Sequence, residues 1–253
     1  DLTFSGSLKC LFSARGNLNR ISESQMMTNL TLDRIGVKTV NGAMIRNVSG
    51  SLDTGPLDSE LKKINFEIGD SSFTADGKMF LRPETKWLIQ VRSPEFNLKK
   101  LIQNLKGLTE AVQLEDWKID WKSIEQSISF IQSDAVYKNM EGQVAFGANR
   151  LVIPDARFDA YNGTASGRAM IDFSETNPST LIEFDLSRLS LAKISSTGKP
   201  PVLEGNLFAA FSLTSSGPVD SGWLDRLTGK GTFSVTNGEL HTLDLLGGLG
   251  QIA

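Results

Sequence analysis

Apolar and polar residues alternate along much of this chain. From Leu2 to Phe12 every even position holds an apolar residue or glycine, and Thr, Ser and Lys hold most odd positions. The same alternation returns from Leu203 to Leu213. A period of two is typical of a β-strand with one apolar, buried face and one solvent-exposed face. The pattern therefore predicts a mainly β protein. Shorter stretches of this kind lie around Leu30, Phe73, Leu88 and Phe233.

Pairs of glycine with Asn or Asp lie between or near these stretches. Such pairs adopt positive φ easily and therefore suit tight hairpin turns. Many strands joined by short turns predict an antiparallel meander. The pairs expected to form turns are Asn41-Gly42, Gly69-Asp70, Asp76-Gly77, Asn162-Gly163 and Asn237-Gly238.

One region has a helical pattern instead. From Asn97 to Val112 the apolar residues recur every three or four positions, which predicts an amphipathic helix. A second helical pattern runs from Asp120 to Gln132. The chain is therefore expected to comprise a β-rich repeat module (1–96), a helical insert (97–133) and a second β-rich module (134–253).

The two β-rich parts resemble each other. The segment Asp76–Met79 leads through a polar turn and a strand to Phe96–Leu98, and Ser166–Ala169 leads in the same way to Leu189–Leu191. The glycines of the two leading segments are Gly77 and Gly167, which lie 167 − 77 = 90 positions apart. Self-similarity of this kind predicts repeated hairpin units that bury their apolar faces together.

Composition and charge exclude several classes of protein. The 26 basic and 29 acidic residues are scattered and give a net charge of −3, whereas a nucleic-acid-binding surface needs concentrated positive charge. Cys10 is the only cysteine, so neither an intramolecular disulfide nor a multi-cysteine zinc site is possible. No stretch approaches the ~20 apolar residues of a spanning helix. Because the chain starts at Asp1 on a strand pattern, we expect any membrane anchor to lie outside it.

The motifs that would indicate catalysis are incomplete. His241 is the only histidine and lies in a hydrophilic turn between Leu240 and Leu243, as ordinary surface histidines do. Ser190-Leu191-Ala192-Lys193 spells S-x-x-K, but neither Ser-Asp-Asn nor Lys-Thr-Gly follows it. Thr228–Thr232 is glycine-rich like a phosphate loop, yet it continues into a strand pattern. We therefore expect no catalytic residue, no metal and no cofactor, and a protein that is not an enzyme.

Residues of the helical insert allow more than one interpretation. Asp116 and Asp120 are spaced for one helix face, as paired carboxylates of a glycosidase or a Ca²⁺ site would be, but a solvated helix surface also explains them. Trp117 and Trp121 suit either a membrane interface or packing of the helix on the sheet.

The order and spacing of several segments in the last third resemble the C-terminal region of AsmA-like proteins of the bacterial cell envelope. The resemblance extends from Leu151 to Ile252, and through the internal repeat alone to Asp1–Ile102, whereas the helical insert has no counterpart in it. The segments that carry the resemblance are Ala160–Gly167, Phe184–Leu191, Leu203–Leu207, Phe211–Gly217 and Leu227–Leu246.

This resemblance implies a periplasmic protein, held in the inner membrane by a helix that is absent from this chain. It also implies a long curled antiparallel sheet with an apolar groove, as in the bridge-like lipid transfer proteins. The implied partners are a phospholipid or another acyl-chain lipid, the inner membrane and possible envelope proteins. The implied role is lipid transport in outer-membrane maintenance and assembly.

Physical chemistry permits that role, because a buried CH₂ gains ~0.8 kcal/mol and needs no specific contact. An alternative is a closed, sandwich-like core, in which case the chain would be a structural or interaction spacer. A carbohydrate-active enzyme is a third possibility. The residues expected to line an open groove are Leu2, Phe4, Leu8, Phe12, Leu203, Leu207, Phe211, Phe233 and Val235.

Overall fold

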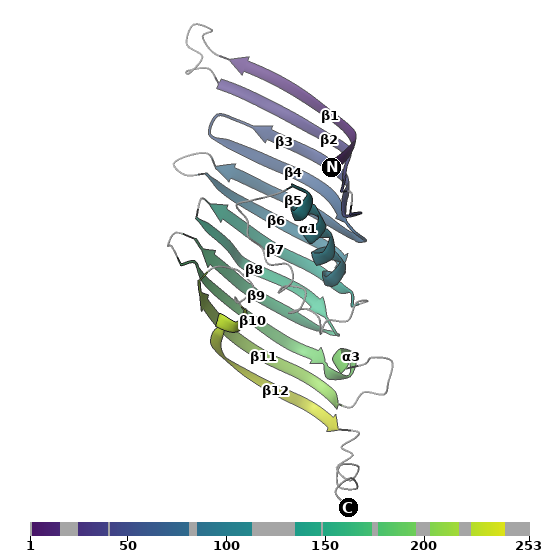
Figure 1. The fold of residues 1–253 in the computed structure, drawn as a ribbon, viewed down its shortest axis with the longest axis vertical. Helices are drawn as coiled ribbons and strands as arrows, with labels where there is room; N and C mark the ends of the chain where they lie inside the picture. The colour runs from purple at the N-terminus through teal and green to yellow at the C-terminus, as the bar shows by residue number, and fades with distance from the viewer. Residues whose placement is uncertain are drawn as a thin grey trace, which may run out of the picture.

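The protein forms one long, twisted, antiparallel sheet in which twelve strands follow one another in chain order (Figure 1). The computed structural model describes residues 2–15, 25–39, 41–80, 85–112, 135–147, 149–173, 177–195, 203–217 and 224–240. The strands are β1 (Leu2–Arg15), β2 (Gln25–Thr39), β3 (Met44–Thr54), β4 (Asp58–Ile68), β5 (Ser71–Phe80), β6 (Lys86–Phe96), β7 (Tyr137–Gly147), β8 (Arg150–Ala160), β9 (Gly163–Asp172), β10 (Ser179–Ser190), β11 (Leu203–Ser216) and β12 (Thr228–Leu240).

Each strand pairs with the next, so the sheet is a meander with β1 and β12 at its two edges. The strands β6 and β7 pair directly although a helix separates them in sequence, and the two β-rich parts therefore form one continuous sheet. The predicted mainly β fold of antiparallel hairpins is confirmed. The sheet is open and is not rolled into a closed channel, and the described residues contain no second sheet of the kind a sandwich needs.

Three of the predicted turns connect strands. Asn41-Gly42 lies between β2 and β3, Gly69-Asp70 between β4 and β5, and Asn162 ends the turn between β8 and β9. Gly42 and Asn162 have φ of 86° and 65°, as the turn pattern predicts.

The other two predicted turns are wrong, because both pairs lie inside strands. Gly77 is in the middle of β5, where a Cβ would stand 2.7 Å from the carbonyl oxygen of Leu88 on β6. Close approach of two strands, and not a turn, therefore requires this glycine. Asn237 has φ of 52° within β12, next to an irregularity in the pairing with β11. It belongs to a β-bulge.

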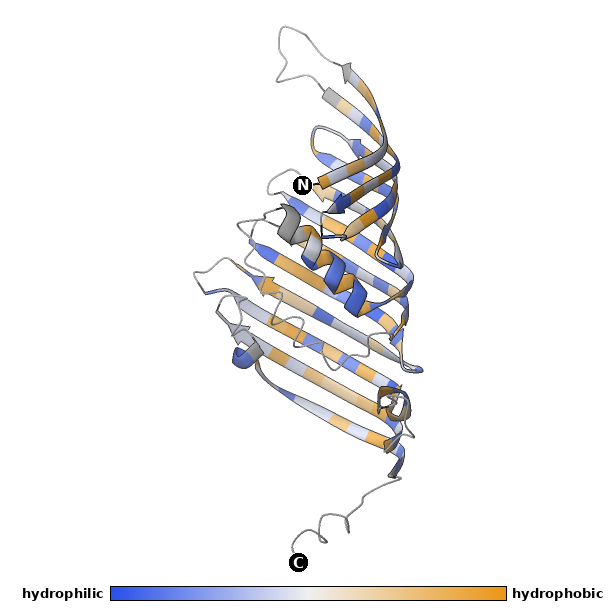
Figure 2. Cartoon of the chain, turned by 45° about the vertical axis from the view of Figure 1, so that its right-hand side comes forward, coloured by the Kyte–Doolittle hydropathy of each residue, from blue (hydrophilic) through white to orange (hydrophobic). Residues whose placement is uncertain are grey.

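Bulges recur along the sheet. Most neighbouring strands shift register at least once, and an extra residue in one strand bends it and increases its twist. Figure 2 shows the resulting bend of the strands and the alternation of hydrophobic and hydrophilic positions along them. The non-glycine residues with positive φ inside strands are Arg34, Asn47, Lys63, Asn139, Arg188 and Asn237.

The helix α1 (Leu98–Val112) follows β6 and lies against one face of the sheet near the ends of its strands (Figure 1). It begins at Asn97, whose Oδ1 accepts a hydrogen bond of 2.9 Å from the backbone N–H of Lys100, as a helix cap does. The Lys100 ammonium then binds Asp70 in the turn before β5. The predicted helix over 97–112 is confirmed, and the predicted helix over 120–132 lies outside the described residues.

The short helix α3 (Leu191–Ser195) repeats this arrangement after β10. Ser190 Oγ accepts a hydrogen bond of 3.4 Å from the backbone N–H of Lys193, and the Lys193 ammonium donates to Asn162 Oδ1 at 2.8 Å. Asn162 lies in the turn before β9, as Asp70 lies in the turn before β5. The two halves therefore share a unit of turn, hairpin, cap and helix. A single-turn 3₁₀ helix, η2 (Leu224–Arg226), precedes β12.

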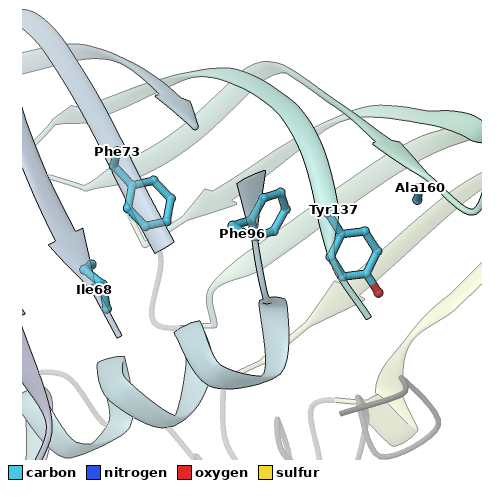
Figure 3. Packing of buried hydrophobic residues seen from close by; sticks show 5 residues of the cluster. All are labelled: Ile68, Phe73, Phe96, Tyr137 and Ala160. Carbon is cyan, nitrogen blue, oxygen red and sulfur yellow. The ribbon is translucent and has the colours of Figure 1, made fainter. Parts of the chain in front are cut away.

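The buried core is small and lies at the margin that α1 covers. Figure 3 shows its members, with Phe96 and Tyr137 beside the start of α1. The rings of Phe96 and Tyr137 are 5.3 Å apart, and Leu101 and Leu105 of α1 pack against the same cluster. The five buried residues of the cluster are Ile68, Phe73, Phe96, Tyr137 and Ala160.

Candidate functional site

The strand registers show which side chains share a face of the sheet. Residues directly opposite each other in antiparallel strands point to the same side. One row of opposed residues crosses seven strands from β1 to β7 and contains six apolar side chains and one glycine. It comprises Cys10, Leu30, Leu52, Leu61, Gly77, Ile89 and Val144. We call the face that carries this row the front face.

A second row on the front face crosses nine strands from β4 to β12. It contains no charged residue, and its bulkiest part is a stacked pair of phenyl rings on β10 and β11. The row comprises Ile64, Ala75, Val91, Gly142, Ala156, Gly167, Phe184, Phe211 and Gly231. The front face is therefore apolar from one edge of the sheet to the other.

Much of this face is accessible. Phe4 is 67% exposed, Phe12 58% and Phe233 76%. Among the described residues, twelve apolar side chains are buried, five of them alanines, whereas thirteen large apolar side chains are exposed. The front face is thus strongly exposed at β1 and β12 and mostly half-buried over the strands between them. Extended apolar surfaces of this kind often serve as binding sites in proteins.

The structure places the predicted groove residues at the two ends of the sheet. Those in β1 share the front face with their opposed β2 residues, as Phe4 does with Val37 and Leu8 with Leu32. Leu207 opposes Val235 across β11 and β12, and Phe211 continues the second front-face row. Leu203 opposes Leu240 beyond the bulge at Gly205, which separates it from the regular part of β11. Leu2 opposes Thr39, and Phe233 opposes Ala209.

The central strands contribute front-face residues that the sequence did not single out. Trp87 of β6 opposes Phe146 of β7, which opposes Leu151 of β8, which in turn opposes Ile171 of β9. All four are half-buried. Their strands alternate as β1 and β11 do, so the same period-two pattern is the signal that identifies them.

The opposite, back face is largely polar. Arg92 on β6 lies within 3.5 Å of Asp76 on β5 and 3.2 Å of Glu141 on β7. A second network joins Lys62 to Asp53 at 2.7 Å and to Glu60 at 3.2 Å. Because these pairs are exposed, they contribute little stability. Their charged groups make this face hydrophilic.

Hydrogen bonds on the back face change the ionisation of its carboxylates. The Lys62 ammonium and the Asn29 amide donate to Asp53, and the pKa of Asp53 is therefore below its ordinary value. Likewise, the Arg168 guanidinium lowers the pKa of Glu183. Both carboxylates stay charged at neutral pH.

One apolar row interrupts the back face over β6 to β10. Each of its side chains is half-buried. The row is shorter than the front-face rows and adjoins charged residues at its β5 end, where Lys78 opposes Leu88. It comprises Leu88, Ala145, Val152, Met170 and Leu181.

Two concave sites lie on the back face. One, of about 560 Å³, is lined by Asp159 and Arg188 near the turn between β8 and β9. The other, of about 450 Å³, is lined by Leu11, Met27 and the Asp53 network near one corner of the sheet. Their lining residues include no member of the two front-face rows.

The S-x-x-K motif has a structural explanation. Ser190 caps α3, and the Lys193 ammonium binds Asn162. The Thr228–Thr232 segment lies within β12, not at the start of a helix as a phosphate loop would. His241, Asp116, Asp120, Trp117 and Trp121 lie outside the described residues.

The described ranges lack two kinds of feature. No group of three or more His, Cys, Asp or Glu side chains is placed there to hold a metal ion. No helix within them has the length and apolar character needed to cross a bilayer. Comparison with known proteins found no matching family model, no matching curated protein and no matching solved structure.

Proposed function

We propose that the front face shelters the acyl chains of a phospholipid or a similar lipid, and that the protein acts in lipid handling at the cell envelope without catalysing a reaction. The observation that supports this proposal best is the continuity of the apolar rows over the whole sheet. Twelve strands at ~4.8 Å spacing give a surface about 53 Å across. A lipid tail on it would meet apolar side chains throughout.

The energetics favour a hydrocarbon partner. Exposed apolar side chains such as Phe4 and Phe233 are in contact with water in the free protein. An acyl chain that covers them gains ~0.8 kcal/mol for each buried CH₂, so a sixteen-carbon chain gains on the order of 12 kcal/mol before the cost of ordering it. This gain depends on area and not on precisely placed polar groups, which agrees with a front face made of aliphatic and aromatic residues.

The envelope part of the proposal rests on a resemblance. The segments that are similar to AsmA-like proteins fall on β8 to β12 and the connections between them. In such proteins the expected location is the periplasm, with an anchor in the inner membrane. We include this location and a contribution to outer-membrane lipid homeostasis in the proposal.

Lipid extraction followed by mass spectrometry tests the proposal. The 253-residue chain is purified without detergent, and the bound lipid is extracted and quantified against protein. The expected result is co-purification of glycerophospholipid in a reproducible molar ratio. Protein that carries no lipid and takes up no fluorescent phospholipid from vesicles would contradict the proposal and favour a spacer whose front face another protein covers.

Two matched variants distinguish lipid binding to the front face from lipid binding to the back face. Val144 is half-buried on the front face, and Val152 is half-buried in the back-face apolar row of the next strand. Val144→Gln should lower the amount of bound lipid, whereas Val152→Gln should leave it unchanged, because only the first introduces an amide among the lipid-facing side chains. Equal effects of the two variants would argue against a front-face site. Circular dichroism checks that both variants fold.

A further inference from the structure

The front face carries hydroxyl groups where β10 begins and β11 ends. Thr180 of β10 opposes Ser215 of β11. Both lie on the front face, because they share the uninterrupted register of Phe184 and Phe211. The two residues are buried, with 4% and 7% of their surface exposed. The apolar front face therefore ends in hydroxyl-bearing side chains at this margin of the sheet.

The Ser215 hydroxyl is buried without a hydrogen bond. Its Oγ has no hydrogen-bond partner among the described residues. A buried hydroxyl without a partner destabilises a fold, and an oxygen of a bound ligand would remove that cost. Ser93 on the opposite margin is also buried, but its Oγ donates to Ser72 O at 2.7 Å. Ser215 is therefore a candidate donor to a ligand, whereas Ser93 is not.

A guanidinium lies near this end of β11. Arg226 belongs to η2, the short yellow-green turn that Figure 1 shows at the margin where β10 begins. Its Nε lies 3.2 Å from the position that a Cβ on Gly217 would occupy, two residues beyond Ser215. The N–H of Gly217 donates to Pro178 O at 2.8 Å, which holds the end of β11 against the segment before β10. A positive charge and a buried hydroxyl therefore lie at the same end of β11.

Ser59 offers a comparison at the same margin, because β4 and β10 run in the same direction in the meander. Its Oγ is also buried and has no partner within the described ranges. However, Asp58 and Glu60 flank it in β4. Carboxylates repel an anionic ligand, whereas the guanidinium of Arg226 attracts one. Of the two buried hydroxyls, Ser215 is therefore the one that suits an anionic group.

Apolar side chains lead away from Ser215 along β10 and β11. The six positions from Leu213 to Leu207 span about 20 Å at a rise of ~3.3 Å per residue, which is long enough for an extended acyl chain. At the far end Leu189 is buried, and α3 follows β10 there. The opposed front-face pairs along this path are Ile182 with Leu213, Phe184 with Phe211, Leu186 with Ala209 and Leu189 with Leu207.

We propose that Arg226 and Ser215 bind the phosphate of a phospholipid headgroup, and that the acyl chains lie along β10 and β11 towards α3. The guanidinium donates charge-assisted hydrogen bonds to phosphate oxygens, and the Ser215 hydroxyl donates another. This inference rests on the proposed lipid binding and adds the position of the headgroup and the direction of the chains. An apolar surface alone would not distinguish a lipid with a phosphate from one without.

Paired ligands measure the contribution of the phosphate. The 253-residue chain, freed of lipid, is titrated with phosphatidic acid and with diacylglycerol of the same acyl chains, both delivered from cyclodextrin in competition with a fluorescent alkyl probe. We expect phosphatidic acid to bind about tenfold more tightly or better, because its phosphate gains charge-assisted hydrogen bonds. Glycerol 3-phosphate should not compete at the same concentrations, because it has no acyl chains.

Four variants locate the phosphate. Arg226→Gln should reduce the ratio of the two lipid affinities to about one. Lys86→Gln removes an exposed positive charge at the same margin, at the start of β6, and should leave the ratio unchanged. Ser215→Ala should lower the ratio about threefold and yet raise the unfolding temperature of the lipid-free protein, because an unpartnered hydroxyl is no longer buried. Ser59→Ala should raise the unfolding temperature without changing the ratio.

The outcomes distinguish this inference from the proposed function. If the wild-type chain binds both lipids equally, or if Arg226→Gln leaves the ratio unchanged, the headgroup site is wrong and lipid binding by the front face still stands. An equal loss in Lys86→Gln would indicate a general charge effect and would also overturn the site. Glycerol 3-phosphate that competes as well as phosphatidic acid would identify a site for soluble phosphates instead. Binding of neither lipid would reject the proposed function itself.

Discussion

The phenyl rings of Phe184 and Phe211 stack across β10 and β11 with their centroids 4.9 Å apart and their planes inclined by 25°. The two residues are directly opposite in the strand register, on the front face, and both are half-buried. The pair therefore joins neighbouring strands through side chains on a surface that has no second sheet over it in the described residues. On such a sheet, cross-strand pairs replace part of the packing that a closed core supplies.

A double-mutant cycle should detect this pairing. Replacing Phe184 and Phe211 by Leu, singly and together, removes the aromatic contact but keeps most of the apolar volume. We expect a coupling free energy of about 0.5–1.5 kcal/mol, measured by urea denaturation. Replacing the neighbouring opposed residues Ile182 and Leu213 by Ala, singly and together, provides an aliphatic comparison. Additive effects of the two Phe substitutions would show that the stack contributes nothing specific.

Two glycines on the front face should respond oppositely to alanine. A Cβ at Gly142 would lie 3.5 Å from its nearest neighbours, Ala156 Cβ and Asp155 O, which is ordinary contact. Gly142→Ala should therefore stabilise the fold by about 0.5–1 kcal/mol, because it restricts the unfolded chain. A Cβ at Gly167 would lie 2.5 Å from Glu183 O, and Gly167→Ala should destabilise the fold by about 1–3 kcal/mol. Thermal unfolding of the two variants compares them directly.

The back-face carboxylate Asp53 should titrate below its ordinary range. Its folded pKa is lowered by the hydrogen bonds from Lys62 and Asn29. A carboxylate with a lowered folded pKa stabilises the fold above its unfolded value of about 3.9, and this contribution is lost as the pH falls through the folded pKa. NMR titration of the side-chain carboxyl should show a low midpoint that rises in Lys62→Met. An unchanged midpoint in this variant would mean that the ion pair does not persist in solution.

The attachment of α1 should depend on its apolar side. Leu105 packs against the buried cluster, whereas Gln103 is exposed on the same helix. Leu105→Ala should lower the local stability of α1 by about 1–2 kcal/mol, because it removes partly buried methyl groups. Gln103→Ala should change it by less than about 0.5 kcal/mol. Hydrogen exchange of the α1 amides measures both effects, and protection in β8 to β12 serves as the internal reference.

The strand pattern could be predicted from the sequence because period-two alternation depends on local residues alone. The alternation from Leu2 to Phe12 falls in β1, and that from Leu203 to Leu213 falls in β11. The helix over 97–112 was predictable for the same reason, since its apolar spacing is local. The two misassigned glycine pairs show the limit of this reasoning. A glycine is needed at position 77 because a Cβ there would be too close to Leu88 on the next strand. Residue preferences for turns carry no information about such a distance.

The rows of the front face could not be assembled from sequence. A single bulge changes which residues oppose each other on the next strand, and a shift by one position moves every later side chain to the other face. The irregularity between Gln143 and Ala145, for example, decides that Phe146 opposes Leu151. For this reason the sequence identified residues at both ends of the sheet but missed the central row that contains Trp87.

The repeated cap has a consequence for how such a sheet can diversify. In both units the cap residue and its lysine fasten only the first turn of the helix to the hairpin before it, through Asp70 in one unit and Asn162 in the other. The two helices differ beyond that turn, since α1 has fifteen residues where α3 has five, and α1 uses its extra length to pack Leu105 against the buried cluster. Insertions at this margin can therefore enlarge or reduce the cover over the apolar surface while the strand ladder underneath keeps its register.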